Sequence, residues 1–144
     1  MKQRLWPVHC VQHTKGADIV GEIDQSKFDI IVKKGMDSRV EMYSAFTDSF
    51  GNLAAGSGSV NIDIGQALKT HHITDVYVVG LAGDYCVKDT ALGSAVAGFG
   101  TYLIEDAQKC GDPEGWSRAK AELLKGSVAV IDLDSKEARR VLGG

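Results

Sequence analysis

The sequence predicts an α/β protein in which helices cover a parallel sheet. Two observations support this fold class. Short, nearly continuous apolar runs are typical of strands that are buried on both faces, and helical patterns lie between these runs. Successive strands are expected to be joined by right-handed crossovers. The 144 residues have the length of a single domain, residues 1–144, that can bury a core.

Four strands are expected, over residues 28–32, 76–79, 101–104 and 128–131. The spacing of apolar residues predicts helices over residues 60–70, 87–99 and 114–125. The second of these helices is rich in alanine and other small residues, which allow close packing on a sheet. Ser135 is the expected N-cap of a short last helix.

Two segments do not fit the alternation of strands and helices. Residues 1–20 show no clear strand, and the glycine-containing residues 49–59 are expected to form a loop. This loop lacks the Gly-Lys-Ser/Thr ending of a phosphate-binding loop, so it does not predict a nucleotide site.

Composition excludes several classes of partner. The net charge is −3 with both signs mixed, so the sequence predicts no nucleic-acid binding. No apolar run approaches the roughly 20 residues of a membrane span, so no membrane partner is expected. The three widely spaced cysteines indicate a reducing compartment, and the N-terminal residues show no signal-peptide core.

The segment that carries the most chemical information is residues 78–91, where an apolar strand leads through a tight turn into a helix. Cys86 lies where this helix begins. Backbone N–H groups and the helix dipole favour negative charge there, and the thiolate is the nucleophilic form of cysteine. The alternative is a buried structural cysteine, which is the usual fate of a free cysteine.

Lys34 follows the first expected strand and is the candidate partner of Cys86. Sites in α/β proteins gather at the carboxyl ends of the strands, and an ammonium group beside a thiol favours the thiolate. The alternative is a solvated surface lysine.

Three motifs in this chain resemble the nicotinamidase branch of the isochorismatase-like cysteine hydrolases. They are Trp-Pro-Val-His-Cys at residues 6–10, Lys-Gly at residues 34–35 with Tyr-Ser-Ala-Phe at residues 43–46, and Gly-Leu-Ala-Gly-Asp-Tyr-Cys-Val-Lys at residues 80–88. They occur in order along nearly the whole chain. The resemblance implies the isochorismatase-like fold, a Rossmann-like parallel sheet flanked by helices. It also implies hydrolysis of nicotinamide to nicotinate and ammonia through a cysteine thioester, in NAD salvage.

The resemblance also implies roles for the residues of the third motif and for Lys34. Cys86 would be the nucleophile, and Lys34 would support its thiolate. The backbone N–H groups of Ala82 and Cys86 would form the oxyanion hole, with a cis peptide bond between Leu81 and Ala82.

The first two motifs imply a substrate pocket and a metal ligand. Trp6 and Tyr43 would line the flat pocket for the pyridine ring, although Trp6 has core packing as its alternative. His9 would be one ligand of a divalent metal ion, usually zinc. Cys10 is expected to be structural, Cys110 has no motif around it, and the remaining histidines, His13, His71 and His72, are expected on the surface.

The sequence lacks two features of the resembled family. The family pattern opens with an apolar strand that ends in the catalytic aspartate, and a following segment supplies Asp-x-His and another histidine to the metal. Asp18, Asp24 and Asp29 all come after the motif at residues 6–10, so none takes that place. We therefore expect the C-terminal part of a nicotinamidase, without the first strands of the family.

These absences shape the functional expectations. The 144 residues alone would be weak or inactive as an amidase, the metal site would be incomplete, and an open sheet edge would favour a homo-oligomer. Gly83, where the family often has threonine, would loosen the turn before the nucleophile. The alternatives are a non-catalytic pseudoenzyme that associates with other subunits, a hydrolase of another small amide or of the vinyl ether of isochorismate, and a redox sensor that uses Cys86.

Overall fold

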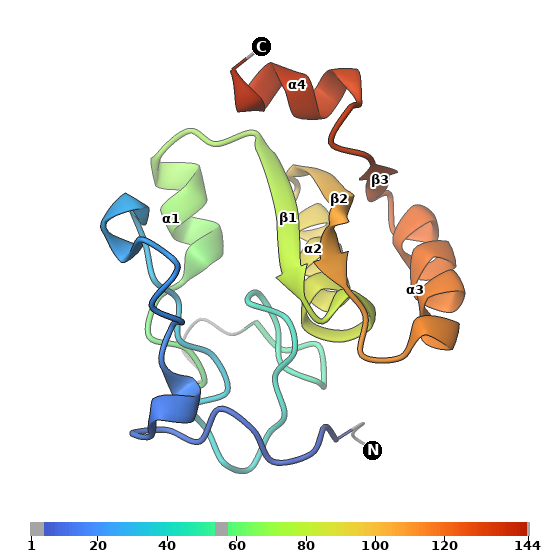
Figure 1. Ribbon diagram of the computed structural model, residues 1–144. Helices are drawn as coiled ribbons and strands as arrows, with labels where there is room; N and C mark the ends of the chain where they lie inside the picture. Colours follow the sequence, from blue (N-terminus) through green and yellow to red (C-terminus); the bar gives the residue numbers. More distant parts are fainter. Residues whose placement is uncertain (1–4, 54–57, 144) are drawn as a thin grey trace.

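The computed structural model describes residues 5–53 and 58–143 (Figure 1). It has the predicted α/β fold. The helices and strands in chain order are α1 (Ile64–Thr70), β1 (Asp75–Leu81), α2 (Lys88–Val96), β2 (Gly100–Lys109), α3 (Pro113–Lys125), β3 (Ala129–Ile131) and α4 (Lys136–Leu142). In the described residues, no helix is both long and apolar enough to cross a bilayer. The loop predicted over residues 49–59 lies in part outside the described residues, at residues 54–57.

The sheet contains three parallel strands in the order β1-β2-β3. Asp75 is in register with Gly100, and Leu103 with Val130. The register shifts between Val78 and Gly80, so the last residues of β1 pair with the far end of β2. These strands confirm the ones predicted at residues 76–79, 101–104 and 128–131.

One face of the sheet carries the core, which α2 and α3 cover. Val78 of β1 and Leu103 of β2 pack against Ala91 of α2 and Leu123 of α3. Both helices had been predicted, but α2 begins one residue later and ends earlier than expected because Val96 gives way to a turn at Gly98, where φ is +94°. The other face carries stacked rings of Tyr77 and Tyr102, with centroids 4.7 Å apart.

The last helix, α4, lies beyond the end of the sheet at which β1 begins (Figure 1). The Ser135 hydroxyl accepts the N–H of Ala138, so the predicted N-cap is confirmed. The Tyr77 hydroxyl donates to the carbonyl of Glu137 across 3.3 Å, and this contact joins α4 to β1.

The strand predicted over residues 28–32 is wrong. Before α1, the described chain has only the 3-10 turns Lys15–Ala17 and Gln25–Lys27 and isolated bridges. Residues 31–33 have no neighbouring strand, and the side chain of Asn61 forms the hydrogen bonds to their backbone instead. The Asn61 side chain accepts the Lys33 N–H at 2.6 Å and donates to the Ile31 carbonyl at 3.1 Å. An apolar run can therefore remain extended without joining a sheet.

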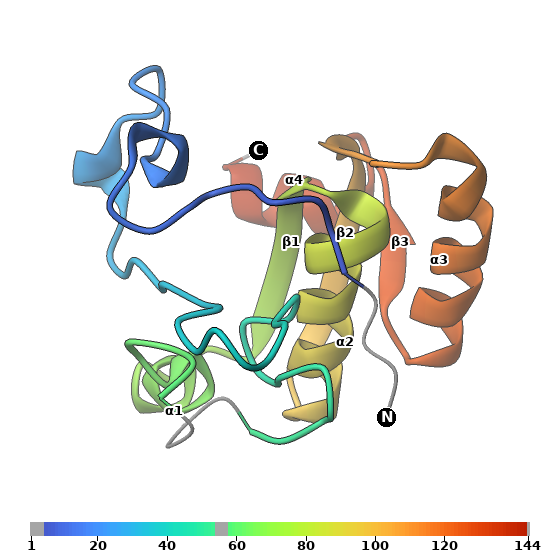
Figure 2. The same ribbon diagram turned by 90° about the horizontal axis from the view of Figure 1, so that it is seen from below.

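This N-terminal part of the described chain runs across the carboxyl ends of the strands (Figures 1 and 2). As a result, the first two motifs lie near the turn that follows β1. The fold thus brings segments that are far apart in sequence to one end of the sheet.

Candidate functional site

The candidate nucleophile lies in the connection from β1 to α2. The peptide bond between Leu81 and Ala82 is cis, as the family resemblance implied. A π-helical turn, Gly83–Val87, follows and leads directly into α2. The Ala82 carbonyl accepts the N–H groups of Tyr85 and Val87 at 3.0 and 3.1 Å. This turn holds Cys86, which is partly exposed, immediately before the helix.

Lys34 lies beside Cys86. Its Nζ donates to Cys86 Sγ at 3.4 Å and to the Met42 carbonyl at 2.9 Å. The backbone around Lys34 is held by an antiparallel bridge to Val60. An ammonium group at this distance stabilises negative charge on sulfur. The expectation that the fold brings these two side chains together is therefore met, although they are 52 positions apart.

Close packing against α2 positions the Tyr-Ser-Ala-Phe motif. A Cβ atom on Gly93 would lie 2.6 Å from the Ser44 hydroxyl oxygen and 3.0 Å from Cβ of Phe46. The Ala45 N–H donates to the Thr90 hydroxyl at 3.2 Å. The small residues of α2 therefore allow close packing against residues 43–46 as well as against the sheet.

Aromatic side chains gather next to the cysteine. The ring centroid of Tyr85 lies 4.4 Å from that of Trp6 and 5.5 Å from that of Tyr43, both in edge-on arrangements. Tyr43 is buried, and Trp6 is partly exposed. Tyr85 thus connects the two predicted pocket residues. Tyr85 was not among the predicted site residues, although its place directly before Cys86 was the available signal.

The other two cysteines lie in different surroundings. Cys10 is exposed, although it was expected to be structural. Burial, followed by the charge of the nearby Asp84, raises the pKa of the Cys110 thiol, which favours its neutral form. Among the described cysteines, Cys86 is the one whose sulfur accepts a hydrogen bond from a lysine.

Gly83 is closely surrounded. A Cβ atom on Gly83 would lie 1.8 Å from Gln108 Oε1 and 3.2 Å from Cys110 Sγ. The Gln108 side chain thus occupies the space that a larger residue at position 83 would need. Whether glycine loosens the turn stays a prediction.

The metal site implied by His9 does not fit the described residues. His9 is exposed, and its Nδ1 lies 2.8 Å from the Pro7 carbonyl oxygen. Residues 5–53 and 58–143 contain no group of three or more His, Cys, Asp or Glu side chains placed to hold a metal ion. A catalytic zinc ion normally takes three protein ligands, which these residues do not bring together. His13, His71 and His72 are exposed, as predicted.

Comparison with known proteins gives a family and a set of relatives. The isochorismatase domain matches residues 1–135. The chain is 38% identical to a nicotinamidase of Saccharomyces cerevisiae over 133 residues, which are 89% of this chain and 58% of that protein. The chain thus spans less than two thirds of this relative's length.

Solved structures agree with this similarity. A nicotinamidase/pyrazinamidase from Acinetobacter baumannii superposes with a TM-score of 0.80 at 34% identity, over 90% of this chain and 60% of that one. The yeast nicotinamidase bound to the inhibitor nicotinaldehyde gives a TM-score of 0.77 over 89% of this chain and 58% of that one. A pyrazinamidase from Pyrococcus horikoshii, solved in complex with zinc, gives 0.72 at 33% identity, over 89% of this chain and 63% of that one.

Proposed function

Because the chain belongs to the isochorismatase family, we propose that it is a cysteine amidase of the nicotinamidase type. The reaction is the hydrolysis of nicotinamide to nicotinate and ammonia, a step in NAD salvage that we assign to the cytoplasm or nucleus. The single observation that carries the proposal is the 3.4 Å contact between Lys34 Nζ and Cys86 Sγ. Similarity to nicotinamidases supports the choice of substrate.

In the proposed first step, the Cys86 thiolate attacks the carboxamide carbon of nicotinamide. Lys34 stabilises the thiolate before the attack. The N–H groups of Ala82 and Cys86 then stabilise the oxyanion, and each such donor contributes about 3 kcal/mol in acyl-transfer enzymes. Breaking the C–N bond gives a thioester, and the nitrogen leaves as ammonia after taking a proton from solvent.

In the second step, water attacks the thioester, which releases nicotinate and restores the thiol. The flat pyridine ring would lie against Trp6, Tyr43 and Tyr85, whose rings are already in contact. Positioned acid–base groups typically accelerate such proton transfers by about 10²–10⁴-fold. In the proposed reaction solvent supplies and takes up these protons, so we expect the 144 residues alone to turn over slowly.

The test measures acylation and turnover separately. The purified chain is incubated with nicotinamide, and hydroxylamine is added to capture the thioester as a hydroxamate while ammonia is assayed. We expect hydroxamate from the parent chain and from Cys10→Ala, and none from Cys86→Ala. Equal hydroxamate and ammonia from the parent chain and Cys86→Ala would contradict the proposal.

The second candidate is a non-catalytic chain that associates with other subunits. The observation that favours it is the open edge of β1, which among the described residues pairs only with β2. It predicts no hydroxamate even at long incubation. If hydroxamate forms with another small aromatic amide but not with nicotinamide, the amidase assignment holds and the substrate changes.

A further inference from the structure

Asp84 is a buried acidic residue for which the proposed reaction has no use. It lies in the π-helical turn two positions before Cys86, and its exposed fraction is 3%. Its Oδ1 accepts the Gly111 N–H at 2.8 Å, and its Oδ2 accepts the Asp112 N–H at 3.1 Å. Because each oxygen is already engaged by a backbone donor, this carboxylate is poorly placed to serve as a base.

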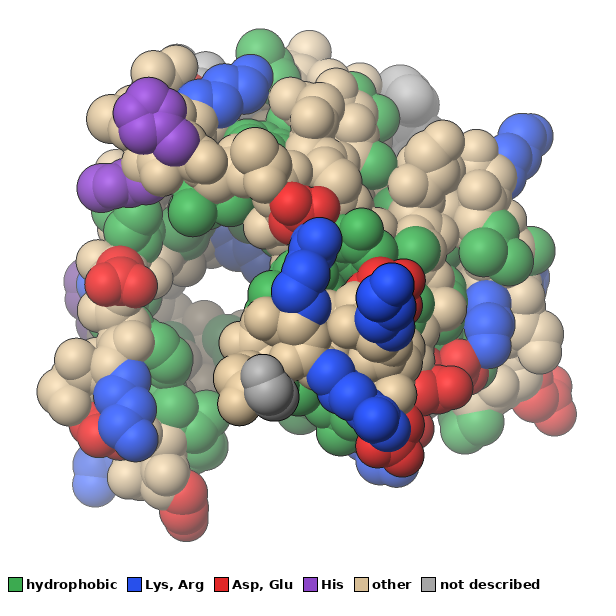
Figure 3. All heavy atoms as spheres, turned by 90° about the horizontal axis from the view of Figure 1, so that it is seen from above, with side chains coloured by type: hydrophobic (Ala, Val, Ile, Leu, Met, Phe, Trp, Pro, Cys, Tyr) green, Lys and Arg blue, Asp and Glu red, His purple; other side chains and the backbone are tan. Residues whose placement is uncertain are grey.

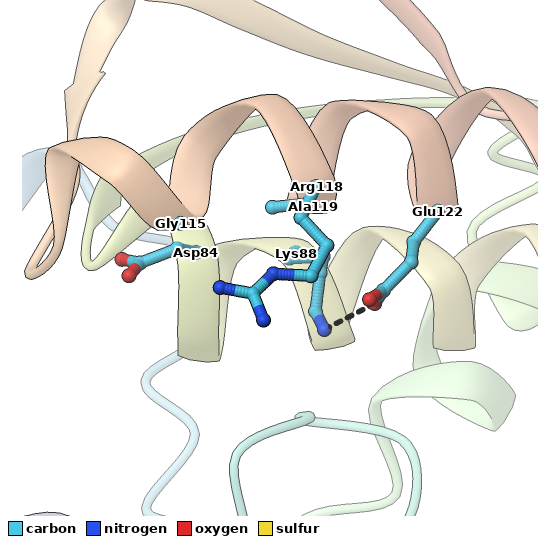
Figure 4. A pocket seen from close by; sticks show the side chains of 6 residues that line it. All are labelled: Asp84, Lys88, Gly115, Arg118, Ala119 and Glu122. Carbon is cyan, nitrogen blue, oxygen red and sulfur yellow. Dashed lines mark hydrogen bonds and ion pairs between the residues drawn. The ribbon is translucent and has the colours of Figure 1, made fainter.

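The two N–H groups belong to the connection between β2 and α3. Asp112 is the N-cap of α3, and its own side chain accepts the Glu114 N–H at 3.1 Å. Asp84 also lines a shallow hollow between α2 and α3, together with Gly115 (Figure 4). A Cβ atom on Gly115 would lie only 3.4 Å from Asp84 Oδ2, so the start of α3 lies close to the nucleophile turn.

The ring of Trp6 packs directly against Gly111. A Cβ atom on Gly111 would lie 2.2 Å from Cη2 and 2.9 Å from Cζ3 of the Trp6 ring. The indole therefore occupies the space that a side chain at position 111 would fill. The same ring contacts Tyr85, which lies between Asp84 and Cys86 in the sequence.

We infer that Asp84 is a positioning residue that fixes Trp6 relative to Cys86 by clamping the backbone of Gly111 and Asp112. The inference rests on the proposed function, because Trp6 is a wall of the proposed pyridine pocket. A carboxylate suits this task, since one planar group accepts two neighbouring N–H groups at once and such charge-assisted bonds are stronger than neutral ones. Through these two hydrogen bonds, the turn that carries Cys86 also determines the position of Trp6.

The first test replaces Asp84 by asparagine, which has almost the same shape. Asparagine keeps one acceptor oxygen but turns an NH₂ group toward the second N–H, so one hydrogen bond is lost. We expect Asp84→Asn to bind nicotinaldehyde about tenfold more weakly, as loss of one such bond implies. We also expect acrylamide to quench Trp6 fluorescence more strongly, measured in a Trp116→Phe background so that Trp6 is the only tryptophan.

Asp112→Asn is the matched control. It removes a charge from the same segment, but asparagine caps helices as well as aspartate, and both N–H groups held by Asp84 remain. Its quenching and nicotinaldehyde affinity should equal those of the parent chain. A folded Asp84→Asn variant with parental quenching and affinity would overturn the inference.

If Asp84→Asn fails to fold, Gly111→Ala tests the contact between Gly111 and Trp6 on which the inference depends. The added methyl group displaces Trp6 while the Asp84 hydrogen bonds stay in place, so quenching should rise and affinity should fall, but the alkylation rate of Cys86 should not change. Parental quenching in Gly111→Ala would overturn the inference. If the parent chain does not bind nicotinaldehyde, the proposed function fails, whereas the quenching measurements still test the clamp.

Discussion

At the scale of single residues, we expect the reactivity of Cys86 to depend on one cation. Lys34 Nζ lies 3.4 Å from Sγ and is fixed by a second hydrogen bond, to the Met42 carbonyl. Two attachments restrict the flexible side chain of the lysine, so its charge stays near the sulfur. The lysine preceding it in the sequence, Lys33, is exposed and offers a matched comparison.

Lys34→Met should slow alkylation of Cys86 by iodoacetamide at neutral pH by about tenfold or more, because an opposite charge within hydrogen-bonding distance favours the thiolate. The rate is measured by mass spectrometry of the peptide that contains Cys86, which separates it from Cys10. Lys33→Met should alkylate at the parental rate. Equal rates in both variants would show that Lys34 does not activate the thiol.

At the scale of elements, α3 is attached to the sheet by an apolar face and by a polar contact. Leu123 is fully buried in the core, whereas the next residue, Leu124, has an exposed fraction of 60%. The Trp116 indole N–H donates to Glu105 of β2 at 2.8 Å, and Lys120 pairs with the same carboxylate. Each of these attachments leads to a separate prediction.

Leu123→Ala should lower the free energy of unfolding by about 2–5 kcal/mol, because it leaves a cavity between α3 and the sheet. Leu124→Ala makes the same chemical change on the exposed side of the helix and should cost less than about 0.5 kcal/mol. Urea denaturation followed by circular dichroism measures both. Similar losses in the two variants would contradict the placement of the core.

Glu105 should make stability depend on pH. Hydrogen bonds from Lys120 and then from Trp116 lower the pKa of this carboxyl below its ordinary value. Because its pKa is lower in the folded state, the ionised Glu105 carboxyl stabilises the folded protein. This contribution is complete above the pKa of the unfolded state and is lost as the pH falls through the pKa of the folded state. The difference in unfolding free energy between the parent chain and Glu105→Gln should therefore shrink on acidification. Urea titrations at neutral pH and below about pH 4 measure this difference.

At the scale of the whole molecule, the sheet is open on one side. In the described part of the chain, β1 pairs only with β2, and its other edge has no strand partner. Val79 and Leu81 of this strand have exposed fractions of 51% and 74%. Viewed along the strands, the molecule is hollowed between the sheet and the N-terminal part of the described chain (Figure 3). An exposed apolar strand edge is a template for pairing with another chain.

We therefore predict that the 144-residue chain self-associates through β1 and that Val79→Lys weakens this association. A charge on the edge strand opposes pairing. Sedimentation velocity over a range of concentrations measures the shift toward monomer. Val96→Lys, at a still more exposed apolar position on α2, should leave the association unchanged. If both variants remain associated, the contact lies elsewhere.

Much of this architecture could be predicted from the sequence because its signals are local. An apolar run marks each of β1, β2 and β3, and the N-cap at Ser135 marks the start of α4. The run at residues 28–32 could not be judged in this way, since it forms a strand only if another strand lies beside it. The proximity of Lys34 and Cys86 was expected from the strand ends and from the family motifs, and it holds although residues 28–32 form no strand. The bridging position of Tyr85 depends on packing between distant segments.

The separation of Lys34 and Cys86 by 52 positions has a consequence for the unfolded chain. Bringing the ends of such a long loop together costs conformational entropy, so the pair does not exist until the intervening α1 and β1 have taken their places. We therefore expect Lys34 to influence the reactivity of Cys86 only once the domain is complete. The labelling rate of Cys86 can serve as a kinetic signal for the last long-range step of folding.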